Sequence, residues 1–220
     1  LLGLVLVGVV FSLPTHLGRA KPSKSAKELF SKSRALNLLA ASRLALFGAR
    51  DVWFVVGVPV FLYSQGWTFP MVGGFMAAWT IGYGLVQSLA PQVVPRSNDG
   101  LSREVPASRA WAFGLALIPV VMVFAIDPSQ VQADLWLVLG LSLFGLAFAV
   151  NSSVHSYLVL AYAGSEKAAE DVGFYYAANA AGRFLGTLLS GWLYGVGGIA
   201  ACLWGSALLL SVGFLLSLGF

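Results

Sequence analysis

Long apolar stretches fill most of the chain, and short polar connections separate them. A helix of about 20 apolar residues, with a rise of about 1.5 Å per residue, crosses a hydrocarbon layer about 30 Å thick. The pattern therefore predicts a series of membrane-spanning helices. A partial span ends at Pro14, a tight Gly197–Gly198 turn joins the last two spans, and the six complete spans are 36–63, 69–90, 110–126, 135–161, 171–196 and 199–219.

The composition agrees with this pattern. Hydrophobic residues make up 58% of the chain and charged residues 10%, whereas about a quarter of the residues in a soluble domain are charged. We therefore expect an all-α integral membrane protein. The chain has one cysteine, Cys202, which excludes an internal disulfide and a cysteine-based metal cluster. We expect no metal and no cofactor, and the sequence has no phosphate-binding loop for ATP.

The basic residues predict the orientation of the spans. Every Lys and Arg except Arg43, Arg50 and Arg183 lies in one alternating set of connections, and residues 14–35 form the most basic of these. Such a bias is typical of cytoplasmic loops. We therefore expect the basic loops and the C-terminus to be cytoplasmic, and the net charge of +4 to reflect this bias and not a nucleic-acid partner. No basic segment precedes the apolar residues 1–13, so we interpret them as the end of a span and not as a signal peptide.

Ionisable residues inside two spans are the strongest sign of function. Arg50 and Asp51 lie about 20 Å from either end of the first complete span, and Arg183 lies about 18 Å into the fifth. Such residues normally face a bundle interior or an aqueous cavity. Two guanidinium groups and one carboxylate leave a net positive charge that suits a phosphate-like oxyanion; alternatively, the three residues form only a structural ion pair. Arg43 is expected either to extend to the interface or to recruit anions.

Helical spacing identifies further candidates. Asn179, Arg183, Thr187, Ser190 and Tyr194 form one polar stripe on the fifth span, and the second and fourth spans also present polar faces. Asn151 is either a contact between helices or a ligand contact, and His155 is either a packing residue or a pH-sensitive group. The predicted substrate-binding residues are Arg50, Arg183, Asn179, Asn151, Tyr83 and Gln87, and the predicted proton-coupling or ion-pair residues are Asp51 and His155.

Two rows of small residues predict close helix packing. Gly182, Gly186 and Ser190 repeat every four residues on the fifth span. The second span has a similar row of Gly74, Ala78 and Gly82. Small residues at this spacing allow two helix backbones to approach closely. We therefore expect a neighbouring helix against both rows.

The order of the spans resembles the C-terminal half of a major facilitator superfamily transporter. Six spans follow a basic loop, and the third and sixth are apolar on all sides. Three segments are also similar to the ArsJ-type organoarsenical efflux permeases: ARDVWFVVGVPVFLY (49–63), VGGFMAAWTIGYGLVQSLAP (72–91) and NAAGRFLGTLLSGWLY (179–194). This resemblance implies a twelve-helix fold in which residues 1–13 end helix six, residues 14–35 link the halves, and residues 36–220 form helices seven to twelve. The usual facilitator loop signature is not recognisable in PQVVPRSNDG (91–100).

The resemblance implies a function as well as a fold. ArsJ-type permeases export 1-arseno-3-phosphoglycerate, which an associated glyceraldehyde-3-phosphate dehydrogenase makes from arsenate, and export confers arsenate resistance. A secondary-active efflux transporter in the bacterial inner membrane, with a missing N-terminal half as partner, is the implied assignment. The alternatives are a facilitator that exports a sugar phosphate or another organic anion, and a drug/proton antiporter. We expect no enzyme, because no nucleophile–base pair lies at matched depth within the spans.

Overall fold

The computed structural model describes residues 11–12, 32–127, 129, 131–163 and 168–220. The chain divides into two units, 1–31 and 32–220. In the first unit only Phe11 and Ser12 are described, and both are helical. Most of the predicted span at 1–13 and most of the predicted basic loop at 14–35 therefore lie outside the described residues, as does Lys167.

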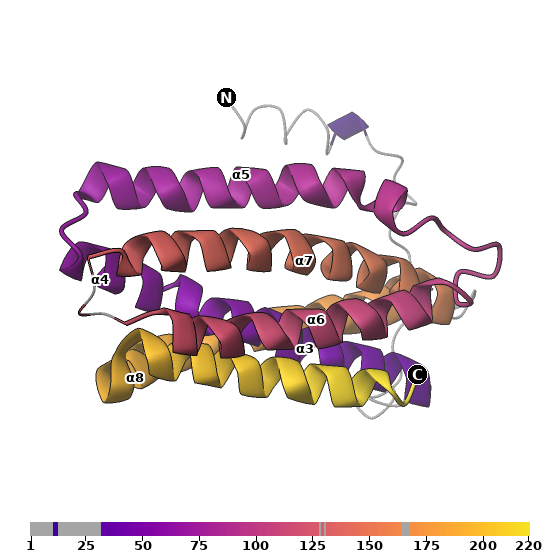
Figure 1. Cartoon of the computed structure of the whole chain (residues 1–220). Coiled ribbons are helices and arrows are strands. Elements are labelled where there is room, and N and C mark those ends of the chain that lie inside the picture. The colour runs from indigo at the N-terminus through magenta and orange to yellow at the C-terminus, as the bar shows by residue number, and fades with distance from the viewer. Residues whose placement is uncertain (1–10, 13–31, 128, 130, 164–167) are drawn as a thin grey trace. The chain divides into compact units, whose positions relative to one another are not determined.

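The larger unit is helical, and no strand occurs among its described residues (Figure 1). Five helical segments are long and apolar enough to cross a membrane, α3 and α4 together counting as one. This agrees with a multi-pass membrane protein. The helices are α3 (Arg34–Phe54), α4 (Gly57–Ser64), α5 (Phe69–Val93), α6 (Glu104–Ala125), α7 (Ala133–Tyr162) and α8 (Ala168–Ser217).

Helix α8 contains both of the last two predicted spans. Its backbone leaves helical geometry at Gly197 (φ −153°, ψ 26°) and Gly198 (φ 62°, ψ −152°). A positive φ is accessible to glycine at little cost because it has no Cβ. The two arms of α8 therefore run back along each other from this point, as Figure 1 shows in orange and yellow, and the predicted Gly197–Gly198 turn is confirmed.

The connection between α5 and α6 is shorter than the loop predicted at 91–108, which has Arg109 at its far edge. Helix α5 continues through Pro91 to Val93, and α6 begins at Glu104. Pro106 lies in the first turn of α6, where a missing backbone N–H breaks no intrahelical bond. The carboxylate of Glu104 accepts hydrogen bonds from the backbone N–H and the hydroxyl of Ser97, which closes the turn before the helix. The prolines in this segment thus do not exclude helix.

The first predicted span is two helices. Helix α3 ends at Phe54 and α4 begins at Gly57. Pro59 has no N–H to donate to the carbonyl four residues earlier, that of Val55, so the helical ladder is interrupted there. The hydroxyl of Ser190 on α8 accepts hydrogen bonds from the N–H groups of Val56 and Gly57, at 3.1 and 3.3 Å. A side chain of α8 therefore satisfies two backbone groups at the break.

Helix α3 belongs to the most buried of the five long apolar segments, and it packs mainly against α8. A Cβ added at Gly182 would lie 2.2 Å from the carbonyl oxygen of Leu44, and one at Gly186 would lie 2.4 Å from that of Gly48. The backbones of the two helices are therefore in contact, which confirms the prediction for this row. Helix α5 packs alongside α7 (Figure 1). Only 11% of the most apolar stretch of α5 is buried, against 67% of that in Arg34–Ser64.

Candidate functional site

Arg50, Asp51 and Arg183 meet at the contact between α3 and α8. The Nε of Arg50 donates a hydrogen bond to Oδ1 of Asp51 at 2.6 Å, and the Nε of Arg183 donates to Oδ2 at 3.2 Å. Each carboxylate oxygen therefore has its own arginine. The Asp51 side chain is 2% exposed, Arg50 is 12% exposed and Arg183 is 59% exposed. The ion pair that was the alternative interpretation is thus present, and one positive charge remains in excess.

The backbone contact between α3 and α8 accounts for this arrangement. Gly182 immediately precedes Arg183, and Gly186 lies one turn further along, with its position for a Cβ 2.9 Å from Cβ of Asp51. Because neither glycine has a side chain, α8 passes close enough for Arg183 to reach a buried carboxylate. The terminal nitrogens of Arg183 make no hydrogen bond to any residue that the structure describes, so they remain available to a ligand.

An open pocket of about 470 Å³ lies against these residues. Its other walls come from the break after α3 and from one face of α5. The Trp79 ring stacks on the Tyr83 ring at 6.0 Å and meets the Trp53 ring edge-on at 5.6 Å. The pocket therefore combines a charged end with an aromatic wall. It is lined by Arg50, Asp51, Phe54, Val55, Met76, Trp79, Thr80, Tyr83 and Arg183.

Of the eight predicted site residues, Arg50, Asp51, Arg183 and Tyr83 line this pocket, and four do not. Asn151 is 1% exposed and His155 is fully buried, both on α7. Asn179 is half-buried, one turn before Arg183, and its Oδ1 has no hydrogen-bond partner among the described residues. Gln87 is half-buried, one turn beyond Tyr83. The structure therefore separates an arginine pocket from a polar group deeper in the bundle.

Arg43 does not extend to the membrane interface, as one sequence interpretation expected. It is 4% exposed, and its Nη1 donates hydrogen bonds to the carbonyl and hydroxyl oxygens of Ser152, both at 3.0 Å. Its guanidinium also lies over the rings of Phe47 and Tyr175. Sequence analysis did not select Ser152. The available signal was its place one residue after Asn151, on the polar part of the fourth span.

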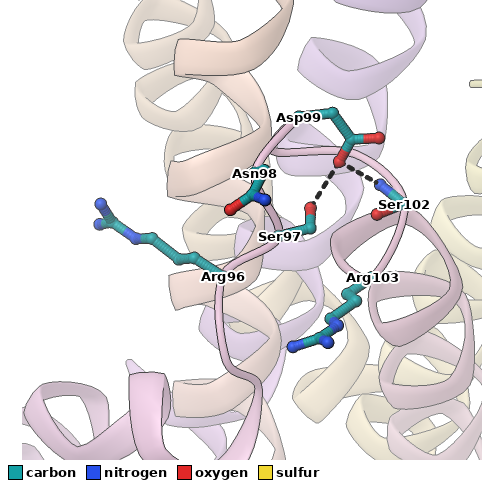
Figure 2. Close-up of a pocket in the computed structure, with 6 residues that line it drawn as sticks. All are labelled: Arg96, Ser97, Asn98, Asp99, Ser102 and Arg103. Atoms are coloured by element: carbon teal, nitrogen blue, oxygen red, sulfur yellow. Dashed lines mark hydrogen bonds between the residues drawn. The ribbon is translucent and has the colours of Figure 1, made fainter.

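A second pocket of about 360 Å³ lies in the α5–α6 connection (Figure 2). Asp99 accepts hydrogen bonds from the hydroxyl of Ser97 and the backbone N–H groups of Leu101 and Ser102. These bonds, that from the Ser102 N–H above all, hold the pKa of Asp99 well below its usual range. Arg96 and Arg103 extend from this turn (Figure 2), and the Arg96 guanidinium lies over the Tyr157 ring. The bonds within the turn account for its shape.

No protein-family model, curated protein or solved structure matches this chain. The class that the fold and composition define is a multi-pass helical membrane protein. The arginine pocket is therefore interpreted from its own chemistry. Within the described residues no group of three His, Cys, Asp or Glu side chains is arranged to hold a metal ion.

Proposed function

We propose that this chain forms half of a secondary-active transporter of the major facilitator type, which exports an anionic organic phosphoester. The cargo we propose is 1-arseno-3-phosphoglycerate, so that export confers arsenate resistance. The observation that carries the proposal is the group of Arg50, Asp51 and Arg183 in an open pocket. The proposed protein is not an enzyme, resides in the bacterial inner membrane with its basic loops in the cytoplasm, and works with an N-terminal half and a glyceraldehyde-3-phosphate dehydrogenase.

The charge of the pocket supports an anionic cargo. Asp51 neutralises one of the two guanidinium groups, so the pocket has an excess of one positive charge. Arg183 uses only Nε on Asp51, which leaves its two terminal nitrogens for a ligand. A guanidinium group can bind two oxygens of a phosphate or arsenate group in parallel, with charge-assisted hydrogen bonds. A hydrophobic cation would be repelled from the same pocket.

The helix break supports a transport cycle. Discontinuous helices in transporters occur next to substrate sites near the middle of the membrane, where unwound backbone lines a cavity. Val55, at the break between α3 and α4, lines the arginine pocket. The break also lies four residues after Asp51, so movement of α4 relative to α3 would change the pocket directly. Alternating access at this point is therefore part of the proposal.

The choice of an arsenate ester over free trivalent arsenic follows from the ligands present. Trivalent arsenic is a soft centre and prefers clustered thiolates. The sole cysteine of the chain, Cys202, is buried, and its Sγ bonds the carbonyl oxygen of Ser190. An arsenate ester with a phosphate at its other end instead presents only hard oxygens. Arginine is the ligand suited to those oxygens.

The test is arsenate resistance in a sensitive bacterial host that expresses the complete transporter with or without the dehydrogenase. We expect protection only when both proteins are present. Arg50→Gln and Arg183→Gln should each abolish most of the protection, because they remove the charge that holds the anion. Arg103→Gln, on the exposed α5–α6 connection, is the matched control and should protect as well as the native protein at equal expression.

Three results would contradict parts of the proposal. No protection by the native protein would exclude the arsenical cargo; export of a sugar phosphate, measured in the same cells, would then be the assignment. Protection without the dehydrogenase would exclude the phosphoester. Full protection by both arginine variants would mean that Arg50 and Arg183 serve only as the ion pair of Asp51.

A further inference from the structure

A second group of polar side chains lies deeper in the bundle than the arginine pocket. It is centred on Arg43, whose guanidinium is buried and, among the described residues, forms hydrogen bonds only with the two oxygens of Ser152. Within the described residues no carboxylate pairs with Arg43. A buried charge without an opposite charge is costly, so its position here requires an explanation beyond packing.

The atoms around Arg43 are also unsatisfied. Its own Nε, Oδ1 of Asn151 and both ring nitrogens of His155 are buried and have no hydrogen-bond partner among the residues that the structure describes. His155 lies one turn after both Asn151 and Ser152 on α7, so the three side chains are neighbours in the part of the helix that Arg43 contacts. Buried polar atoms are normally paired. Arg43 Nε and one ring nitrogen of His155 are donors, whereas Asn151 Oδ1 and the other ring nitrogen are acceptors, so the group suits a partly protonated oxyanion that both accepts and donates hydrogen bonds.

Two aromatic side chains separate this group from the arginine pocket. Tyr83 lines the pocket, and its hydroxyl lies 3.3 Å from the hydroxyl of Ser152. Phe47 lies between the two arginines along α3, and its ring centroid is 4.2 Å from Cζ of Arg43 and 5.1 Å from Cζ of Arg50. Tyr83 also stacks on Trp79, so its side chain must move for an anion to pass between the two polar regions.

We infer that Arg43, with Ser152, Asn151 and His155, is a second anion-binding point, which a phosphate-type oxyanion occupies on its way to or from Arg50 and Arg183. The inference rests on the proposed function, since it assumes that the anion moves along α3. The spacing of seven residues between Arg43 and Arg50 keeps both guanidinium groups on one face of the helix. Tyr83 and Phe47 then form the boundary that the anion crosses between the two points.

The test measures the access of thiol reagents to single cysteines in the complete protein, reconstituted in vesicles. With Cys202 (Cys202→Ser) and every cysteine of the other half replaced, Ser152→Cys reports on the second point and Thr80→Cys on the arginine pocket. Ser206→Cys, a fully buried serine of α8, is the matched control. Each is treated with an anionic and with a neutral methanethiosulfonate, with and without inorganic phosphate. Asn151→Cys replaces Ser152→Cys if the latter does not fold.

We expect Ser152→Cys to react, phosphate to slow its reaction, and Ser206→Cys to remain unreactive. Adding Arg43→Gln should lower the ratio of anionic to neutral reaction rates at Ser152→Cys about tenfold or more, which is the usual scale of electrostatic steering; a purely structural role of Arg43 would leave this ratio unchanged. An unreactive Ser152→Cys, or an unchanged ratio, overturns the inference. Phosphate protection at Thr80→Cys alone overturns it and leaves the proposed function standing, and protection at neither site contradicts both.

Discussion

Two helices carry the same row of small residues and use it in opposite ways. On α8, Gly182 and Gly186 press against the backbone of α3, with positions for a Cβ 2.2 and 2.4 Å from carbonyl oxygens. On α5, Gly74 and Gly82 have nothing within 4 Å of the same position among the described residues. The row on α5 was predicted to pack against a neighbouring helix, and in the described part of the chain it does not.

The difference shows what such a row can and cannot specify. Small residues permit close approach of another backbone, but the rest of the fold decides whether a neighbour is there. On α8 the small residues do contact the backbone of α3, and this close packing brings Arg183 within reach of the buried carboxylate of Asp51. On α5 the large side chains of the same helix, Trp79 and Tyr83, face α7 and the pocket instead. The packed row therefore builds the site, and the open row does not.

Alanine in the packed row should give the largest effect. Gly182→Ala or Gly186→Ala puts a methyl group into backbone atoms that cannot rotate away, so α3 and α8 must separate. We expect a loss of about 3 kcal/mol in the free energy of unfolding and a matching fall in thermal stability in detergent. Gly191 lies on the same helix, and a Cβ added there meets nothing within 4 Å, so Gly191→Ala should leave stability nearly unchanged. Equal melting temperatures for all three variants would contradict the packing described.

Removal of the Ser190 hydroxyl should have the next largest effect. Ser190→Ala leaves the N–H groups of Val56 and Gly57 without their acceptor at the break between α3 and α4. The expected loss is about 2 kcal/mol, because buried donors become unsatisfied. The matched control is Ser211→Ala on the same helix, whose hydroxyl bonds only the carbonyl of Ala207 one turn earlier. If both variants have the same melting temperature, the Ser190 hydroxyl does not stabilise the break between α3 and α4.

Alanine in the open row should have a small effect of opposite sign. Gly74→Ala and Gly82→Ala meet open space and improve helix propensity, by up to about 1 kcal/mol each. Thermal unfolding of the complete protein in vesicles should show equal or higher stability for both variants. A clear loss of stability would show that a partner packs on this face in the membrane and would remove the contrast between the two rows.

The smallest expected effect on stability comes from a further pair of ionic contacts between the start of α3 and the start of α8. Lys32, just before α3, pairs with Glu170 and Asp171 at the start of α8. Burial by itself lowers the pKa of Lys32, but the bonds to Glu170 and Asp171 outweigh it and raise the pKa above the ordinary value of 10.5. Because the folded-state pKa is raised, the stabilisation is complete below pH 10.5 and disappears as the pH rises through the folded-state value.

The measurement is the difference in unfolding free energy between the native protein and Lys32→Gln. We expect about 1 kcal/mol near neutral pH, since one of the partners is partly exposed to solvent. The difference should shrink towards zero in strongly alkaline buffer. A difference that grows with pH would contradict the sign of the pKa shift.

Local patterns predicted the parts of the structure that depend on few residues. The Gly197–Gly198 turn follows from the special backbone freedom of glycine, and the meeting of Arg50, Asp51 and Arg183 follows from equal depth in two spans. The break after Phe54 was missed, although Pro59 and Gly57 were visible signals. A proline inside a span can leave only a kink in a continuous helix, so the sequence alone did not show that the helix ends at Phe54.

The burial of Arg43 could not be read from its own helix. At its position a long basic side chain can extend to the interface or turn inward, and the outcome depends on Ser152, which is 109 residues away in the sequence. The surroundings of Asn151 and His155 could not be predicted either. Helical spacing places both side chains on one face, but it does not show that their buried polar atoms have no hydrogen-bond partner among the described residues. Orientation in the membrane and the identity of the cargo stay predictions.

Direct binding tests the central claim, that Arg50 and Arg183 form an anion site. The fluorescence of the complete protein in lipid nanodiscs, which includes Trp79 in the pocket wall, is titrated with 3-phosphoglycerate. We expect saturable binding that Arg183→Gln weakens about tenfold or more, the scale of one charge-assisted hydrogen bond, whereas Arg103→Gln should bind as the native protein does. Equal affinity in all three proteins, or an equal loss in both variants, would contradict it.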